Sequence, residues 1–276
     1  MRNKVLLSIA LLLIFVSASL FTYPEVSKQV AQGQNDVVIS QFDKIAENVQ
    51  GNNGGKKTES DNGNDSGNDC GYSTYEEAAA DGAVNDEGYL IDDDGEVISD
   101  YPVVFQMDLE RLYQDSAAYN AALNERQDMN VDFAVPALDL TDYGIFDGIY
   151  GYISAPSIGL NIPLYLGAGE YNMAWGGAHL YHTSLPLGGE STNTVIAGHT
   201  GYFGRTVFDY LPQLSEGDSV SVTTYFGTLN YRVVAKKEIT ATETNDLYIS
   251  KGKDLLTLIT CARMGKSRYE VICERA

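Results

Sequence analysis

Short runs of β-forming residues follow one another along the second half of the chain, from about residue 150 onward. Each run is bounded by Gly, Pro or Asn, and seven can be recognised: residues 152–155, 162–166, 193–197, 219–225, 229–235, 255–260 and 269–273. Several short strands separated by turn residues predict a mainly β domain, built as a sandwich or a closed barrel. Helical content should be minor there, with short turns around residues 169–175 and 206–214.

A long uncharged run lies at the start of the chain. Residues 5–21 carry no charge, and Arg2 and Lys4 precede them. A run of this length lies at the short end of what spans a hydrocarbon core of about 30 Å. Positive charge before the run places the N-terminus inside and the rest of the chain outside. We therefore predict a membrane anchor over residues 1–22. A cleavable signal peptide is the alternative, and both imply export.

Two segments follow the predicted anchor. Residues 23–50 are expected to form a helical stalk, because apolar side chains recur there at helical spacing, at Val38, Phe42, Ile45 and Val49. Residues 51–100 form an acidic insert that should be largely disordered, since its first part is rich in Gly, Asn, Asp and Ser and cannot bury a core. Two similar units over 86–98, each with an Asp and a Gly, suggest one small hairpin.

A further helix should begin near Asp108, a residue type that caps helix N-termini. Its apolar side chains are expected on one side of the helix, at Leu109, Leu112, Tyr113 and Leu123. The predicted organisation therefore continues with an N-terminal helix and a candidate lid in residues 101–147, and a catalytic β-barrel in residues 148–276.

The net charge of −20 excludes a nucleic-acid ligand, because a phosphate backbone would be repelled. The charge is unevenly placed. Residues 51–100 hold 14 acidic against 2 basic side chains, whereas residues 148–276 hold 11 against 10. The acidity belongs to the insert and says little about the surface of the β-rich half.

One cysteine stands where a reactive group would be useful. Cys261 ends an apolar run, so a strand would present its thiol at the strand end, and Arg268 opens the next predicted strand. A strand, a loop and a returning strand would bring the guanidinium beside the thiol, where it favours the thiolate and can stabilise an oxyanion. A Cys261–Cys273 disulfide or a plain core cysteine are the alternatives, and Cys70 is the third cysteine of the chain.

A histidine follows another apolar strand. His199 lies between glycines in the sequence GHTG, where the backbone can turn sharply and leave the imidazole accessible. From the residues alone, a catalytic set of Cys261, His199 and Arg268 competes with a plain loop histidine. A zinc site is a further alternative, because His179 and His182 have the spacing H-x-x-H, but the cysteine spacing does not fit a zinc ribbon.

These residues resemble the signature of a known family. TLITC (residues 257–261) followed by Arg268 looks like the sortase TLxTC…R signature, and NTVIAGHTG (193–201) is similar to that family's strand-and-histidine segment. Residues 151–158 and 177–191 resemble the class C, pilus-assembling branch, as do the short segments 23–27 and 119–123.

The resemblance implies an eight-stranded sortase-type β-barrel on the outer face of a Gram-positive cell membrane. It implies cleavage of an LPxTG-like sorting signal between Thr and Gly, without a cofactor or metal. The Cys261 thiolate would attack the Thr carbonyl, His199 would protonate the departing Gly amine, and Arg268 would bind the oxyanion. A pilin lysine or a cell-wall peptide would then take the acyl group from the enzyme. His179 has no catalytic position in the family pattern and is expected to be structural.

Class C sortases commonly carry a lid over the cysteine, and the resemblance extends this expectation to residues 128–150. Two candidate anchors for such a lid are Asp132-Phe133 and the aromatic run over 143–150. Within the family, the alternative is a housekeeping-type sortase or one of another class. Outside the enzyme class, the alternative is an anchored extracellular module whose barrel binds a ligand without catalysis.

Overall fold

The structure is a computed structural model that describes residues 23, 26–47, 75–85, 89–98, 107–201, 204–262 and 265–276. The predicted anchor over 1–22, the first part of the acidic insert and Cys70 lie outside these residues. Among the helices that the described ranges contain, none combines the length and the apolar character needed to cross a bilayer.

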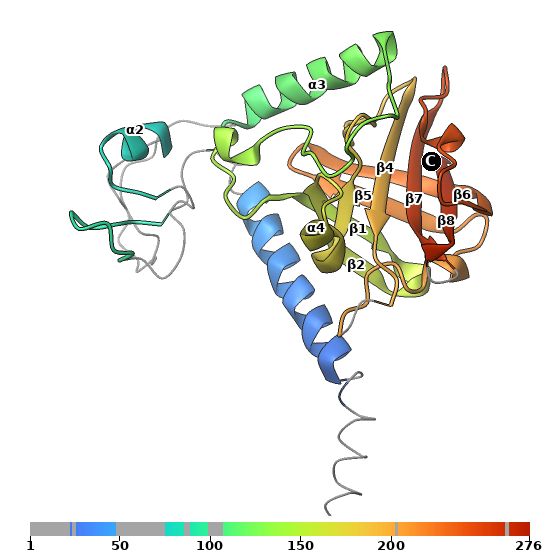
Figure 1. The fold of residues 1–276 in the computed structure, drawn as a ribbon, viewed down its shortest axis with the longest axis horizontal. Coiled ribbons are helices and arrows are strands. Elements are labelled where there is room, and N and C mark those ends of the chain that lie inside the picture. Colours follow the sequence, from blue (N-terminus) through green and yellow to red (C-terminus); the bar gives the residue numbers. More distant parts are fainter. Residues whose placement is uncertain are drawn as a thin grey trace, which may run out of the picture.

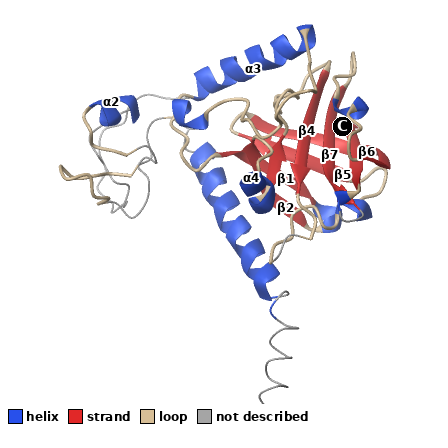
Figure 2. Cartoon of the chain, viewed as in Figure 1, coloured by secondary structure: helices blue, strands red, loops and turns tan. Residues whose placement is uncertain are grey.

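Eight strands close into a barrel, as the family resemblance implies (Figures 1 and 2). Their order around the barrel is β1-β2-β3-β4-β7-β8-β6-β5, and the pairs β2–β3 and β4–β7 are parallel. The strands are β1 (Ile149–Ala155), β2 (Leu160–Leu166), β3 (Gly177–His179), β4 (Thr192–Gly198), β5 (Ser219–Thr224), β6 (Gly227–Thr240), β7 (Asp254–Ala262) and β8 (Ser267–Arg275).

All seven predicted strands are present, and the predicted turns correspond to α4 (Glu170–Trp175) and the 3-10 helix η3 (Leu211–Gln213). The eighth strand, β3, has only three residues and shows no alternation that sequence reasoning could detect. The sandwich alternative is wrong, because β1 pairs with β5 and so closes the sheet on itself. Closure leaves no sheet edge unpaired.

The barrel wall separates two apolar layers. Successive residues of a strand point to opposite faces. Leu256 and Leu258 of β7 belong to the main core inside the barrel, whereas Ile259 belongs to a second cluster on the outer face. The same alternation holds for β4, where Ile196 joins the main core and Val195 the outer one. This outer cluster lies next to the three predicted catalytic residues, Cys261, His199 and Arg268.

Two long helices pack against the barrel (Figure 1). Helix α1, residues 26–47, lies within the segment predicted to be a helical stalk, residues 23–50, and its Phe42 is buried in the main core. Helix α3 (Leu109–Glu125) begins as predicted, since the Asp108 carboxylate accepts a hydrogen bond from the Arg111 N–H at 3.0 Å. The prediction that Tyr113 belongs to the apolar side of α3 is wrong, because Tyr113 is exposed.

The buried face of α3 is partly polar, for a reason the pattern could not show. Ser116 and Asn120 are buried and find partners, Ser116 on the Tyr150 hydroxyl and Asn120 on the main chain of Leu185. Buried polar groups are tolerated where hydrogen bonds satisfy them. These bonds tie α3 to the barrel.

The described part of the insert holds α2 (Tyr75–Ala80) and a small hairpin. Ile91 bridges Val97, and the Asp92 N–H donates to the Glu96 carbonyl at 3.0 Å across Asp94-Gly95. The turn glycine has φ +82°, the left-handed region that glycine adopts without a steric cost. The predicted hairpin with an Asp-Gly turn is therefore present at this position.

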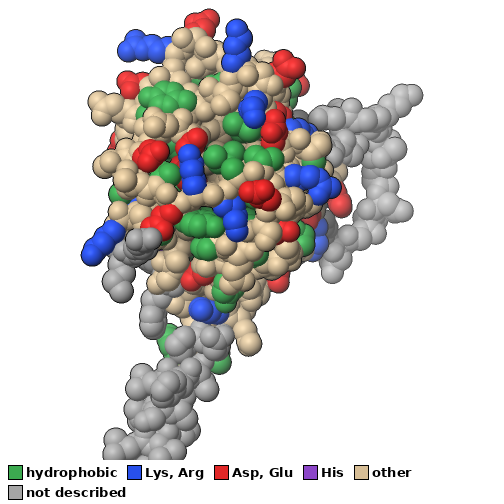
Figure 3. All heavy atoms as spheres, turned by 90° about the vertical axis from the view of Figure 1, so that its right-hand side faces the viewer, with side chains coloured by type: hydrophobic (Ala, Val, Ile, Leu, Met, Phe, Trp, Pro, Cys, Tyr) green, Lys and Arg blue, Asp and Glu red, His purple; other side chains and the backbone are tan. Residues whose placement is uncertain are grey.

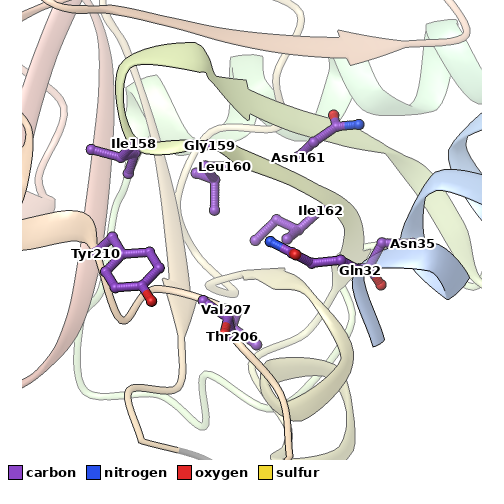
Figure 4. A pocket seen from close by; sticks show the side chains of 10 residues that line it. All are labelled: Gln32, Asn35, Ile158, Gly159, Leu160, Asn161, Ile162, Thr206, Val207 and Tyr210. Carbon is purple, nitrogen blue, oxygen red and sulfur yellow. The ribbon is translucent and has the colours of Figure 1, made fainter. Parts of the chain in front are cut away.

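A small pocket lies between α1 and the barrel, lined by Gln32 and Asn35 of α1, residues 158–162 and the segment around Val207 (Figure 4). None of the three predicted catalytic residues lines it. The face of the molecule in Figure 3 carries acidic and basic side chains interspersed, as expected for a nearly neutral barrel.

The packing of α1 generates a stability prediction. The Phe42 ring lies 4.5 Å from the ring of Tyr225 and 5.8 Å from that of Tyr152, between ring centroids. We expect Phe42→Ala to lower the free energy of unfolding by about 3 kcal/mol, because it leaves a cavity in the core. Urea unfolding measures the change. Val37→Ala on the same helix is the control, since Val37 is 58% exposed and its loss should change stability by less than about 0.5 kcal/mol.

Candidate active site

Cys261 lies at the end of β7, where the buried strand reaches the surface. The six residues before it are all buried, and Cys261 itself is half-buried. Both cysteines of the described residues, Cys261 and Cys273, are free, so the disulfide alternative is wrong. Cys273 is fully buried, and burial raises the pKa of its thiol to about 12, so it stays protonated at neutral pH. Cys261 is therefore the more accessible of these two thiols.

Arg268 lies directly opposite Cys261 in the antiparallel ladder between β7 and β8. Opposite residues of such a ladder have Cβ atoms about 4.5–5.5 Å apart and project from the same face of the sheet. The Arg268 Nη1 donates to the carbonyls of Gly265 and Ser267 at 3.2 and 3.3 Å, which holds the guanidinium at the turn between β7 and β8. The returning strand thus places Arg268 opposite the cysteine, as the order strand, loop and strand predicted.

His199 lies on the other side of Cys261. The parallel ladder between β4 and β7 ends at the pair Gly198 and Thr260, so the next residue of each strand is His199 and Cys261. The main chain of His199 is fixed at both ends: its N–H donates to the Met173 carbonyl at 3.2 Å, and its carbonyl accepts from the Phe208 N–H at 2.9 Å. Three neighbouring strands thus align His199, Cys261 and Arg268 in one row with the cysteine in the centre.

Hydroxyl groups lock the strand end that carries His199. Thr260 Oγ1 donates to the Gly198 carbonyl at 2.7 Å and lies 2.6 Å from Thr200 Oγ1. Gly198 is required here, since a Cβ on it would lie 2.7 Å from the Phe208 ring. The row is held by main-chain pairing and these bonds.

The other two histidines, His179 and His182, make hydrogen bonds within the fold. His179 is fully buried, and its Nε2 lies 3.1 Å from the carbonyls of Thr183 and Ser184. Burial lowers the pKa of His179 to about 4, so the ring is neutral at physiological pH. The Nδ1 atom of His182 lies 3.0 Å from the Asp128 carbonyl. Within the described ranges no three His, Cys, Asp or Glu side chains gather where they could hold a metal ion.

The segment after α3 covers the sheet face next to this row. Met129 and Phe133 pack into the outer apolar cluster together with Ala197 and Ile259. Ala197 precedes His199 by two residues and Ile259 precedes Cys261 by two, so both project from the face that carries the row. Apolar side chains therefore occupy the surface on which a peptide would have to lie to reach Cys261.

Hydrogen bonds attach this covering segment at both ends. The Ala168 N–H donates to the Phe133 carbonyl at 2.8 Å, and Gly167 allows the close approach, since a Cβ there would lie 2.5 Å from the Ala134 carbonyl oxygen. At its start, the Gln127 side chain donates to the His182 carbonyl at 2.9 Å and accepts from the Ile249 N–H at 2.8 Å.

The structure distinguishes the two candidate anchors of a lid. Phe133 contacts the outer cluster, while the neighbouring Asp132 carboxylate accepts from the Ala134 N–H within its own turn. Tyr143 and Tyr150 are buried in the main core, bonded to Asp115 and Ser116 respectively, so the aromatic run over 143–150 is structural and not part of the cover.

One polar group beside the row escaped the sequence reasoning. Glu270 of β8 is fully buried and lies near Lys237 of β6 and Asp246 of the 3-10 helix η4 (Asn245–Leu247). A glutamate in an otherwise buried strand segment was the signal that could have drawn attention to it. Its partners could not have been found, because they come from a strand and a loop that precede it in the chain and meet it only in the fold.

Comparison with known proteins agrees with this geometry. The family model described as "Sortase domain" matches residues 153–276. Sortase A of Bacillus anthracis is 28% identical over 125 residues, which are 45% of this chain and 58% of that protein.

Solved structures extend the likeness. Sortase C1 of Streptococcus agalactiae, in complex with MTSET, is 30% identical, with a TM-score of 0.56 over 61% of this chain and 89% of that one. A lid mutant of the same enzyme has a TM-score of 0.53 at 29% identity, over 61% and 88% of the two chains. Sortase C-1 of Actinomyces oris is 32% identical, with a TM-score of 0.53 over 60% of this chain and 98% of that one. The fold, the row at the strand ends and these likenesses together establish that the chain belongs to the sortase family of enzymes.

Proposed function

We propose that this chain is a class C-like sortase, a cysteine transpeptidase that joins proteins through a sorting signal. The substrate is an LPxTG-like sequence near the C-terminus of a pilin or surface protein. The observation that carries the proposal is the row in which Cys261 lies between His199 and Arg268 on three neighbouring strands. The similarity to sortase C1 proteins, one of them from a pilus island of its organism, supports the assignment to the pilus-assembling branch.

The reaction proceeds in two halves through a covalent intermediate. The Cys261 thiolate adds to the carbonyl carbon of the Thr–Gly bond, and Arg268 donates hydrogen bonds to the resulting oxyanion. The C–N bond then breaks, His199 gives its proton to the departing Gly amine, and a thioester remains on Cys261. In the second half an amine, a pilin lysine or a cell-wall peptide, attacks the thioester and displaces the thiolate, and its proton returns to His199.

In this proposal the covering segment acts as a lid. While Met129 and Phe133 occupy the outer cluster, the peptide cannot lie beside Cys261, so the segment has to move before the first step. The likeness to an enzyme studied as a lid mutant supports this role. The enzyme would act on the outer side of the membrane, attached through the predicted anchor over residues 1–22.

One prediction of this proposal concerns the nucleophile, Cys261. We expect Cys261→Ala to reduce cleavage of an LPxTG-type peptide by at least about a thousandfold, because no thioester can form. Chromatography of the released glycine-terminal fragment measures the rate. Cys273→Ala is the matched control and should cleave at a rate close to the wild type, since that thiol is buried. Cleavage by the Cys261 variant would refute the enzyme assignment in favour of a binding module.

The second prediction concerns the guanidinium. Arg268→Lys should lower kcat/KM by about a hundredfold, because an ammonium cannot reproduce the planar set of donors. Steady-state peptide cleavage measures the loss. Arg275→Lys at the other end of β8 should have little effect, since Arg275 contacts the Tyr231 ring and not the row. Turnover like that of the wild type in Arg268→Lys would transfer the role to another group, with Arg263 as the next candidate.

The third prediction concerns the lid. Phe133→Ala should increase the rate at which a small thiol reagent modifies Cys261 by about tenfold, because burial of the aromatic ring stabilises the closed segment. Mass spectrometry of the modified chain over time measures the rate. Val135→Ala is the control, since Val135 belongs to the same segment but is 42% exposed. Equal rates in Phe133→Ala and the wild type would show that this segment does not limit access.

A further inference from the structure

Glu270 is a carboxyl group buried in the sheet face that carries the catalytic row. It follows Arg268 by two residues on β8, so both side chains project from the same face. Its partners in the ladders are Ile259 on β7 and Lys237 on β6, which makes it the diagonal neighbour of Cys261. Its exposed fraction is 0%. A charged residue type in such a place costs free energy unless its environment compensates.

The compensation is incomplete. Lys237 forms its close ion pair with the Asp246 carboxylate, and its Nζ atom lies 3.9 Å from the nearer Glu270 oxygen, beyond hydrogen-bonding distance. Neither Glu270 oxygen accepts a hydrogen bond from any group in the described ranges. One ammonium therefore faces two carboxyl groups, and the buried one has no donor of its own.

This environment favours the protonated form of Glu270. Burial raises the pKa of its carboxyl to about 7, the negative charge of Asp246 contributes in the same direction, and the positive charge of Lys237 opposes both. Glu243, in the loop before η4, also raises this pKa. Arg268 on the same strand and Cys261 on β7 are the remaining titratable groups that the ladders place on this face around Glu270.

Asp246 belongs to the segment that packs on the sheet face carrying Glu270. Leu247, the next residue of η4, packs in the outer cluster with Ile259. The amide of Asn193 donates to the carbonyls of Asp246 and Tyr248 at 2.8 and 3.2 Å, and the Gln127 side chain binds the Ile249 N–H. The segment is therefore attached to β4 and to the start of the lid as well as to the cluster around Glu270.

We propose that Glu270 is a positioning residue for the substrate site: in its neutral form it lets the Lys237–Asp246 ion pair hold η4 against the sheet, and loss of its proton releases η4. Once Glu270 is ionised, two carboxylates compete for one ammonium in a buried place, and moving Asp246 outward relieves the repulsion. The outer cluster then loses the contact of Leu247, and a peptide that lies across this face binds more weakly. The catalytic consequence rests on the proposed function, whereas the movement of η4 does not.

The direction of the pH effect follows from the raised pKa. The folded chain holds the Glu270 proton more tightly than the unfolded chain, so the contribution of the neutral form to stability is fully present below the ordinary glutamate pKa of about 4.5. It is lost as the pH rises through about 7. The segment around η4 should therefore be held at pH 6 and loosened at pH 8.5.

Hydrogen exchange of the full chain tests the proposal without relying on activity. After correction for intrinsic exchange rates, the amides of residues 243–250 should exchange about tenfold faster at pH 8.5 than at pH 6 in the wild type. In Glu270→Gln, whose side chain is neutral at both pH values, they should stay protected. Glu274→Gln is the matched control: Glu274 lies on the same face of β8 but is only half-buried, forms an ion pair with Lys253 at 3.6 Å, and should behave like the wild type.

Peptide cleavage adds the catalytic readout. The KM for the sorting peptide should rise about three- to tenfold between pH 6 and pH 8.5 in the wild type and stay flat in Glu270→Gln, while the pH profile of kcat is the same in both.

Equal pH dependence of exchange in Glu270→Gln and the wild type would overturn the proposal. If Glu270→Gln does not fold, Asp246→Asn decides: without the second carboxylate nothing competes with Glu270 for the Lys237 ammonium, so the difference in exchange between pH 6 and pH 8.5 should disappear, and a difference like that of the wild type contradicts the proposal. Inactivity of every variant with the exchange pattern intact would instead count against the proposed function.

Discussion

The parallel pairing of β4 with β7 is the constraint on which the active site depends. These strands are not consecutive, since β5 and β6 lie between them in the chain, yet their ladder runs in register from Thr192 and Asp254 to Gly198 and Thr260. Parallel strands end at the same edge of a sheet, so the residues that follow, His199 and Cys261, emerge side by side. A shift of one residue would turn one of the two side chains to the other face of the wall.

The antiparallel return of β8 completes the arrangement. It places Arg268 opposite the cysteine, and it places Glu270 one pleat further along the same face. A single sheet face therefore carries a reactive row and, beside it, a floor of Ala197, Ile259 and Glu270. The covering segment after α3 and the η4 segment both pack on that floor. The row itself is aligned by the strand pairing of β4, β7 and β8.

The covering segments are linked to each other as well as to the sheet. Gln127 binds both His182 at the base of the lid and Ile249 after η4, and Asn193 binds η4 from within β4, with its Oδ1 accepting from Thr257 of β7 at 3.0 Å. Side-chain amides suit this purpose, since each offers donors and an acceptor at once. These hydrogen bonds connect the covering segment after α3 with the η4 segment and with β4.

The sequence by itself determined the local features: seven of the eight strands, the N-cap of α3, the hairpin turn and the candidate set of Cys261, His199 and Arg268. Alternation, cap residues and motifs are short-range signals that need no knowledge of the fold. Tertiary structure alone decided which strands are neighbours, that Phe133 and not Tyr143 covers the site, and that Glu270 meets Lys237 and Asp246. Periodicity tells which face a side chain takes within its strand, but contacts between distant segments depend on how the barrel closes, and no local pattern encodes that closure.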